Sequence, residues 1–118
     1  MLLTLICVCL VAGAALGDSI QSEESDGPRS VGDSVTLRCS YTTSNSYVYL
    51  YWYRQFPNQA PQYILLKGAK SNSQYSDTAN FAKKRFSSQT DDSSTVLSIT
   101  ALELSDTAVY LCALRVAL

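Results

Sequence analysis

The sequence predicts an all-β domain built as an antiparallel sandwich or barrel. Several short segments alternate apolar and polar residues with a period of two, and turn-prone stretches rich in Gly, Pro, Asn, Asp and Ser separate them. No segment sustains an apolar repeat of 3.6 residues long enough for a helix. Many short strands at regular spacing are typical of sandwiches and barrels. The 118 residues of the chain hold at most one such domain.

The first element is an apolar leader, "MLLTLICVCLVAGAALG". Its apolar run is shorter than the roughly 20 residues that a membrane-spanning helix needs. Ala15 and Gly17 give the small-x-small pattern that a signal peptidase accepts. We therefore expect residues 1–17 to be a signal peptide, and residues 18–118 to be a secreted or lumenal domain.

This division of the chain decides which cysteines remain in the domain to form a disulfide. Cys7 and Cys9 lie in the leader, whereas Cys39 and Cys112 belong to the domain. A pair of cysteines in an oxidising compartment is expected to form a disulfide. Such a bridge across most of the domain is worth roughly 4 kcal/mol in the entropic model.

The first two predicted strands cover residues 34–41, "SVTLRCSY", and residues 49–56, "YLYWYRQF". In the first, Leu37 and Cys39 share the buried face with their apolar neighbours two positions away. In the second, Trp52 lies on one face, and Tyr51, Tyr53 and Gln55 lie on the other.

Three further strands are predicted at residues 61–68, 94–102 and 106–112. The first of these, "PQYILLKG", ends at Gly68, and the second places Leu97 on its apolar face. In the third, "DTAVYLC", Tyr110 and Cys112 share one face with Ala108. One helical turn is possible in the stretch "TALELSD" at residues 100–106.

The composition argues against several classes of function. Nine basic and ten acidic side chains leave a net charge of −1, which gives no basis for binding nucleic acid or an anionic membrane. There is no histidine, so histidine-dependent triads and imidazole metal ligands are excluded. The neighbouring acidic pairs, 23–24 and 91–92, point apart in an extended chain. We expect no enzyme activity, cofactor, metal site or small-molecule substrate.

The order and spacing of three residues, together with several motifs, resemble a known family. Trp52 follows Cys39, Tyr110 precedes Cys112 by two positions, and the motifs are "LRCSY", "WYRQFP", "RFSS" and "LSDTAVYLC". This pattern resembles the variable domain of an antigen receptor. The stretches "WYRQFPNQAPQYIL" and "CALR" are most similar to a T-cell receptor alpha (or delta) variable segment. The resemblance implies an immunoglobulin V-type antiparallel sandwich with a core of Leu37, Trp52, Leu97 and Tyr110 around the Cys39–Cys112 bridge.

Variable segments of this family receive their last strand, with its Phe-Gly-x-Gly pattern, by recombination, and no such pattern occurs here. The chain therefore resembles a germline segment that lacks its final strand. The strand that carries Cys112 is then expected to be an open sheet edge, which is an aggregation liability.

The resemblance also implies roles for individual residues. Arg85 is expected to form a bidentate salt bridge with Asp106 at one end of the sandwich. The residues implied on a chain-pairing face are Tyr51, Tyr53, Gln55, Pro61, Tyr63 and Leu111. The residues implied in antigen-contact loops are Ser44, Asn45, Ser46, Tyr47, Lys67, Lys70, Ser71, Asn72, Ala113, Leu114 and Arg115. Composition alone also fits a half-exposed sheet face and ordinary turns.

The function implied is recognition of peptide presented by a major histocompatibility molecule, in a heterodimer with a T-cell receptor beta-chain variable domain. Signalling subunits would join through a constant region, at the extracellular face of the plasma membrane. Two alternatives remain at this point. One is an immunoglobulin light-chain-like segment, and the other is a stand-alone innate or adhesion receptor domain of the same type.

Overall fold

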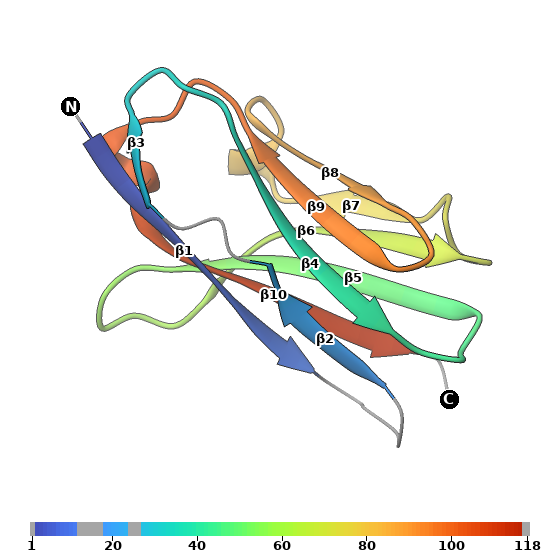
Figure 1. Ribbon diagram of the computed structural model, residues 1–118. Coiled ribbons are helices and arrows are strands. Elements are labelled where there is room, and N and C mark those ends of the chain that lie inside the picture. Colours follow the sequence, from blue (N-terminus) through green and yellow to red (C-terminus); the bar gives the residue numbers. More distant parts are fainter. Residues whose placement is uncertain (1, 12–17, 24–26, 117–118) are drawn as a thin grey trace.

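The computed structural model describes residues 2–11, 18–23 and 27–116, and it consists of two β-sheets packed face to face (Figure 1). One sheet has the order β2-β4-β9-β8, and the other has the order β3-β1-β10-β5-β6-β7. The first contains β2 (Ser19–Ser22), β4 (Val35–Thr42), β9 (Ser94–Ile99) and β8 (Phe86–Thr90). The second contains β3 (Gly27–Ser30), β1 (Leu2–Val11), β10 (Ala108–Val116), β5 (Tyr47–Gln55), β6 (Gln62–Lys70) and β7 (Ser76–Thr78). The all-β sandwich predicted from the sequence is confirmed.

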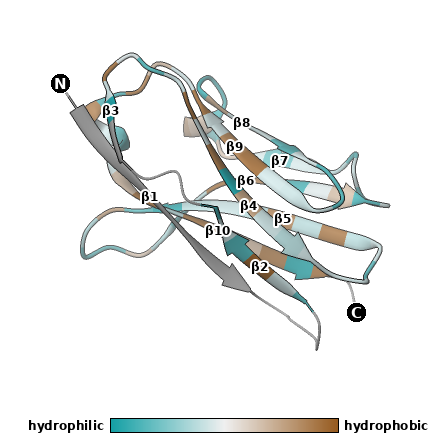
Figure 2. Ribbon diagram, in the orientation of Figure 1, coloured by the Kyte–Doolittle hydropathy of each residue, from teal (hydrophilic) through white to brown (hydrophobic). Residues whose placement is uncertain are grey.

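The core lies between the two sheets because the strands bury every second side chain. Along β4 buried and more exposed residues alternate strictly from Val35 onward. Figure 2 shows the same alternation of hydrophobic and hydrophilic residues along β2. The predicted core residues Leu37, Trp52, Leu97 and Tyr110 are all completely buried.

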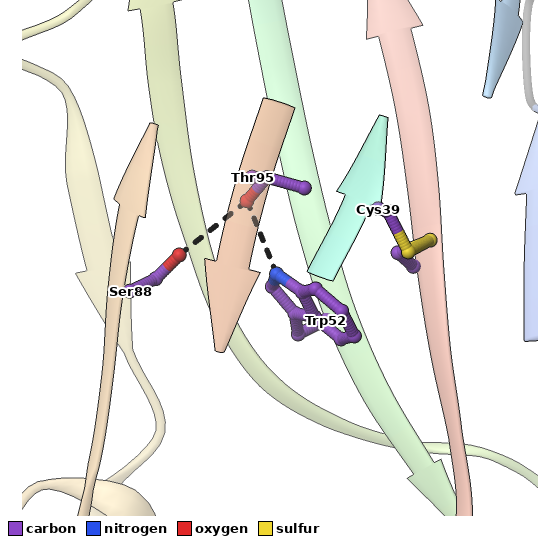
Figure 3. The surroundings of a disulfide bond; sticks show 5 residues. Cys39, Trp52, Ser88 and Thr95 are labelled. Atoms are coloured by element: carbon purple, nitrogen blue, oxygen red, sulfur yellow. Dashed lines mark hydrogen bonds between the residues drawn. A yellow bond between two sulfur atoms is a disulfide. The ribbon is translucent and has the colours of Figure 1, made fainter. Parts of the chain in front are cut away.

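A disulfide joins the two sheets through the middle of this core. It links Cys39 of β4 to Cys112 of β10, as the sequence predicted, across a separation of 73 residues. Trp52 of β5 lies opposite Cys112 in the strand register, and its indole is beside the bridge (Figure 3). The indole Nε1–H donates to Thr95 Oγ1 at 3.1 Å, so the one polar atom of the buried ring is satisfied.

One end of the sandwich, called the closed end here, is formed by Arg85, Glu103, Asp106 and Tyr110. Both terminal nitrogens of Arg85 donate to the Asp106 carboxylate at 2.9 Å, and the Glu103 backbone N–H donates to it at 2.9 Å. The Tyr110 hydroxyl donates to the Asp106 carbonyl oxygen at 2.6 Å. Asp106 ends the short 3-10 helix η2 (Leu104–Asp106), which falls within the single turn predicted from the sequence.

A second cation reinforces the closed end from β5. Arg54 Nη1 lies 3.9 Å from Asp106 Oδ1, and the guanidinium lies 4.2 Å from the ring centroid of Phe81. Phe81 belongs to the 3-10 helix η1 (Asn80–Ala82), which the sequence analysis did not predict. A buried carboxylate is tolerated here because cations and N–H donors surround it.

The outer edge of β10 is paired in the complete chain, where β1 runs parallel to it from Leu5 opposite Ala108 to Val11 opposite Leu114. β1 lies within the expected leader, so the open edge expected for residues 18–118 stays a prediction. Backbone N–H and C=O groups at a sheet edge take a partner wherever an extended segment is within reach. The predicted cleavage site after Gly17 lies outside the described residues. Within the described ranges, no helix is long and apolar enough to cross a membrane.

Candidate functional site

The outer face of the six-stranded sheet carries a row of tyrosines. Tyr51 and Tyr53 of β5 stack with their ring centroids 6.1 Å apart, and Tyr63 of β6 meets Tyr53 edge-on at 6.0 Å. Leu111 of β10 lies opposite Tyr53 in the register. These four residues, called the tyrosine face below, are close together in space as the sequence predicted for them. Each of the three rings is half-buried.

The tyrosine face is neutral at physiological pH. Burial raises the pKa of Tyr63, and its hydrogen bond to Asp77 Oδ2 at 2.8 Å raises it further. Burial, followed by the neighbouring Tyr51, also raises the pKa of Tyr53. Gln55, at the end of the row, donates one amide N–H to the carbonyl oxygen of Gln59 at 2.8 Å. An amphipathic surface without net charge results.

Beyond Gln55 the molecule is hollowed by an apolar pocket of about 420 Å³. The β5–β6 turn forms one wall and the start of β10 forms the other. The lining residues are Gln55, Phe56, Pro57, Asn58, Thr107, Ala108 and Val109. The predicted face residue Pro61 is exposed in the same turn.

The opposite end of the sandwich, called the loop end, holds two short loops and the end of β10 (Figure 1). The first loop covers only residues 43–46, because Tyr47 already pairs with Lys70 in the sheet. Asn45 Oδ1 accepts from the Tyr47 backbone N–H at 2.9 Å, and Thr43 Oγ1 accepts from the Asn45 N–H at 3.1 Å. The Lys70 ammonium donates to the Thr43 carbonyl oxygen at 2.8 Å, which ties the first loop to β6.

The second loop covers residues 71–75 and folds back over Gly68. A Cβ added at Gly68 would lie 2.0 Å from the Asn72 carbonyl oxygen, so no larger residue fits under this loop. The Gly68 N–H donates to the Tyr75 carbonyl oxygen at 2.8 Å. Lys67, which the sequence placed in a loop, lies within β6 opposite the inward-facing Leu50.

The residues expected to begin a third loop also lie in a strand. Ala113, Leu114 and Arg115 belong to β10, which stays paired with β5 up to Val116 opposite Val48. Leu114 is only 1% exposed and faces the core. Arg115 is exposed on the outer face.

Sequence reasoning missed an aromatic cluster at the loop end, called the Tyr49 cluster below. The guanidinium of Arg115 lies 4.3 Å from the ring centroid of Tyr49 and 5.9 Å from that of Tyr51. On its other side, Tyr49 meets Tyr75 edge-on at 5.8 Å. The predicted strand at residues 49–56 includes Tyr49. Alternation places Tyr49 on the same face as Tyr51, but it does not show that Arg115 and Tyr75 lie beside it.

Comparison with known proteins identifies the family of this chain. The model of the immunoglobulin V-set domain matches residues 24–117. The chain belongs to the immunoglobulin V-set family. This V-set domain is 36% identical over 115 residues to the T-cell receptor alpha chain V region RL-5 of Oryctolagus cuniculus, covering 95% of the chain and 79% of the relative. It is 37% identical over 110 residues to T cell receptor alpha variable 18 of Homo sapiens, covering 92% of the chain and 91% of the relative.

A further relative, T cell receptor alpha variable 9-1 of Homo sapiens, is 36% identical over 109 residues, with 92% of each chain covered. The resemblance noted from the motifs is confirmed, and the V-set domain has the role of a T-cell receptor variable domain. Among the described residues, no three His, Cys, Asp or Glu side chains gather to hold a metal ion. The chemistry that this arrangement offers is binding, through an uncharged sheet face and a set of loops.

Proposed function

We propose that this domain pairs with the variable domain of a T-cell receptor beta chain, and that its loop end contacts peptide presented by a major histocompatibility molecule. The tyrosine face carries the first part of the proposal. Interface cores are enriched in tyrosine and depleted in charge, and this face has both properties. Its rings already contact one another, so little side-chain freedom is lost when a partner covers them.

The loop end supports the second part of the proposal. Between them, the two loops contain Ser, Asn, Thr, Gln and Tyr, which combine adaptable hydrogen bonds with large, stiff contact areas. Hydrogen bonds to Lys70 and Gly68 fix the two loops to β6, so the binding surface is supported by a rigid sheet.

The proposal includes the cellular setting. Residues 1–17 act as a secretory leader, and the domain lies outside the cell once a constant region with a membrane anchor follows it. Signalling subunits associate through that constant region. The domain recognises its target by surface complementarity and catalyses no reaction.

Chain pairing is tested by placing a charge in the tyrosine face. Tyr53→Glu should abolish pairing with the beta chain, because a carboxylate would be buried without a partner. Thr36→Glu is the matched control, because Thr36 is exposed on the outer side of the other sheet. Co-purification of the two chains and circular dichroism of the free chain measure pairing and folding separately.

Two results would contradict the pairing proposal. The first is a Tyr53→Glu chain that still pairs with the beta chain. The second is a wild-type domain that associates only with itself, which would favour the adhesion alternative.

A further inference from the structure

The Arg115 side chain is held in place but keeps its hydrogen-bond donors unused. Its contacts within the described part of the chain are with the rings of Tyr49 and Tyr51. No carboxylate among those residues lies within ion-pair distance of it, and no acceptor bonds to its N–H groups. The Arg115 side chain is exposed.

The Tyr49 ring fixes the orientation of the guanidinium. Arg115 and Tyr49 are direct cross-strand partners, and the guanidinium carbon lies over the ring at 4.3 Å. A guanidinium stacked on an aromatic face is attracted to the ring and still presents N–H groups at its edge. Tyr75 holds Tyr49 from the other side, so this fork of donors depends on the second loop as well.

Among the described residues, the charged groups beside the two loops include the Asp18 carboxylate, which accepts from Thr43 Oγ1 at 2.7 Å. The loops at residues 43–46 and 71–75 contain no charged side chain. Two lysines also lie beside these loops: the Lys70 ammonium donates to the Thr43 carbonyl oxygen, and Lys67 pairs with Ser76 next to the second loop. A planar fork of donors with a fixed positive charge matches a carboxylate, which can accept two parallel hydrogen bonds.

We propose that Arg115 is a specificity-determining residue that binds a carboxylate of the antigen, so that this domain selects presented peptides with an acidic side chain. The inference rests on the proposed function. Arg115 lies at the loop-end margin of the tyrosine face, 5.9 Å from the ring centroid of Tyr51, and it stacks on Tyr49, one step nearer the loop end. The proposal assigns its N–H groups to the antigen, and the variants below distinguish this from a contact with the partner domain. The acidic residue would lie beside Arg115, next to the loops at residues 43–46 and 71–75.

The test uses the complete receptor, with this domain in its full chain and paired with a beta chain. A library of random peptides, displayed in presenting molecules of the species that encodes the chain, is selected for binding. We expect Asp or Glu to be enriched at one peptide position. Arg115→Ala should remove this enrichment and weaken binding of the selected acidic peptides by roughly tenfold. Arg115→Glu should shift the preference at that position to Lys or Arg.

Two further variants test whether the peptide preference depends on the location of the Arg115 charge and on the Tyr49 ring beneath it. Lys84→Glu makes the same change in charge at an exposed site outside the loop end and should leave the peptide preference unchanged. Tyr49→Leu keeps Arg115 but removes the ring beneath it. Because Tyr49 is a positioning residue, Tyr49→Leu should lower the ratio of acidic to neutral peptides among the binders without reversing the preference.

Three results would overturn the inference. The selected peptides could lack acidic enrichment, or keep it unchanged in Arg115→Ala. Arg115→Glu could instead weaken chain pairing while the selected peptides stay the same, which would assign the carboxylate to the partner domain. A paired receptor that selects no peptide at all would overturn the proposed function and this inference together.

Discussion

The two ends of the sandwich differ in how their charged side chains are placed: the closed end buries a paired carboxylate, and the loop end exposes a guanidinium. At the closed end, the Asp106 carboxylate is completely buried and receives hydrogen bonds from Arg85 and from the Glu103 backbone. At the loop end, Arg115 is exposed, rests on Tyr49 and has no ionic partner among the described residues. A buried charge must be paired for the fold to survive, whereas an exposed charge is solvated and remains available to a ligand. The buried ion pair that stabilises the fold therefore lies at one end, and the charge proposed to contact the antigen lies at the other.

The disulfide lies between these ends, and its loss should have the largest effect. Replacing both cysteines, Cys39→Ala with Cys112→Ala, should cost about 2–5 kcal/mol of the free energy of unfolding. Urea denaturation followed by Trp52 fluorescence measures this change. Hydrogen exchange should show that amides at the two ends of β5, near Tyr47 at the loop end and near Gln55 at the closed end, lose protection together. If only one end lost protection, the two ends would be separate cooperative units.

Removing the buried charge of Asp106, at the closed end, should have the next largest effect on the free energy of unfolding. Asp106→Asn leaves Arg85 with only the exposed Glu103 carboxylate, at 3.5 Å, as an ionic partner, and should cost on the order of 3 kcal/mol of the free energy of unfolding. Thermal unfolding at pH 7 measures this loss. Asp91→Asn is the control, because Asp91 is an exposed carboxylate whose bonds are to nearby Ser93 and Ser94. A loss below about 1 kcal/mol would contradict a central role for the Asp106 pair.

The same carboxylate predicts how stability depends on pH. Burial raises the pKa of Asp106, but hydrogen bonds from Arg85 and the Glu103 backbone, with the charges of Arg85 and Arg54, hold it below the ordinary value. A lowered pKa in the folded state means that this stabilisation is complete above the unfolded pKa of about 3.9. It is lost as pH falls from there through the folded pKa. The melting temperature of wild type should drop more steeply than that of Asp106→Asn over this range.

The smallest effect on stability is expected at the loop end. Tyr75→Ala removes one edge-on ring contact from a half-exposed position, so we expect a loss below about 1 kcal/mol. The Arg115 guanidinium should nevertheless become more mobile, because Tyr49 loses its support. Thermal unfolding measures the first effect, and NMR relaxation of the Arg115 Nε–H measures the second. A large loss of stability with an unmoved Arg115 would remove the contrast between the two ends.

The fold was accessible from the sequence because period-two alternation shows which side chains are buried. The spacing of Cys39, Trp52, Tyr110 and Cys112 then indicated the family. Alternation does not reveal which strands are neighbours, so the pairing of β1 with β10 and the contact of Trp52 with Thr95 were missed. The short strands β2, β3, β7 and β8 carry too few residues for a clear pattern.

The candidate site was predictable in part for the same reason. The tyrosines of β5 were placed on one face by alternation, and the structure brings Tyr51, Tyr53, Tyr63 and Leu111 together. The loops were predicted too long, because the Tyr47–Lys70 and Val116–Val48 pairings extend the strands. Ser- and Asn-rich composition marks a turn without fixing where pairing stops.

The 73 residues between the two bridged cysteines also set an order of events during synthesis. At about 5–20 residues per second, the Cys39 thiol waits roughly 4–15 s before Cys112 has been made. During that interval Cys7 and Cys9, both made earlier, are the thiols within the same chain that Cys39 can oxidise with. Four cysteines allow three complete pairings, and two allow one. Early removal of residues 1–17, as proposed above, would leave Cys112 of β10 as the one other cysteine within these 118 residues with which Cys39 can pair.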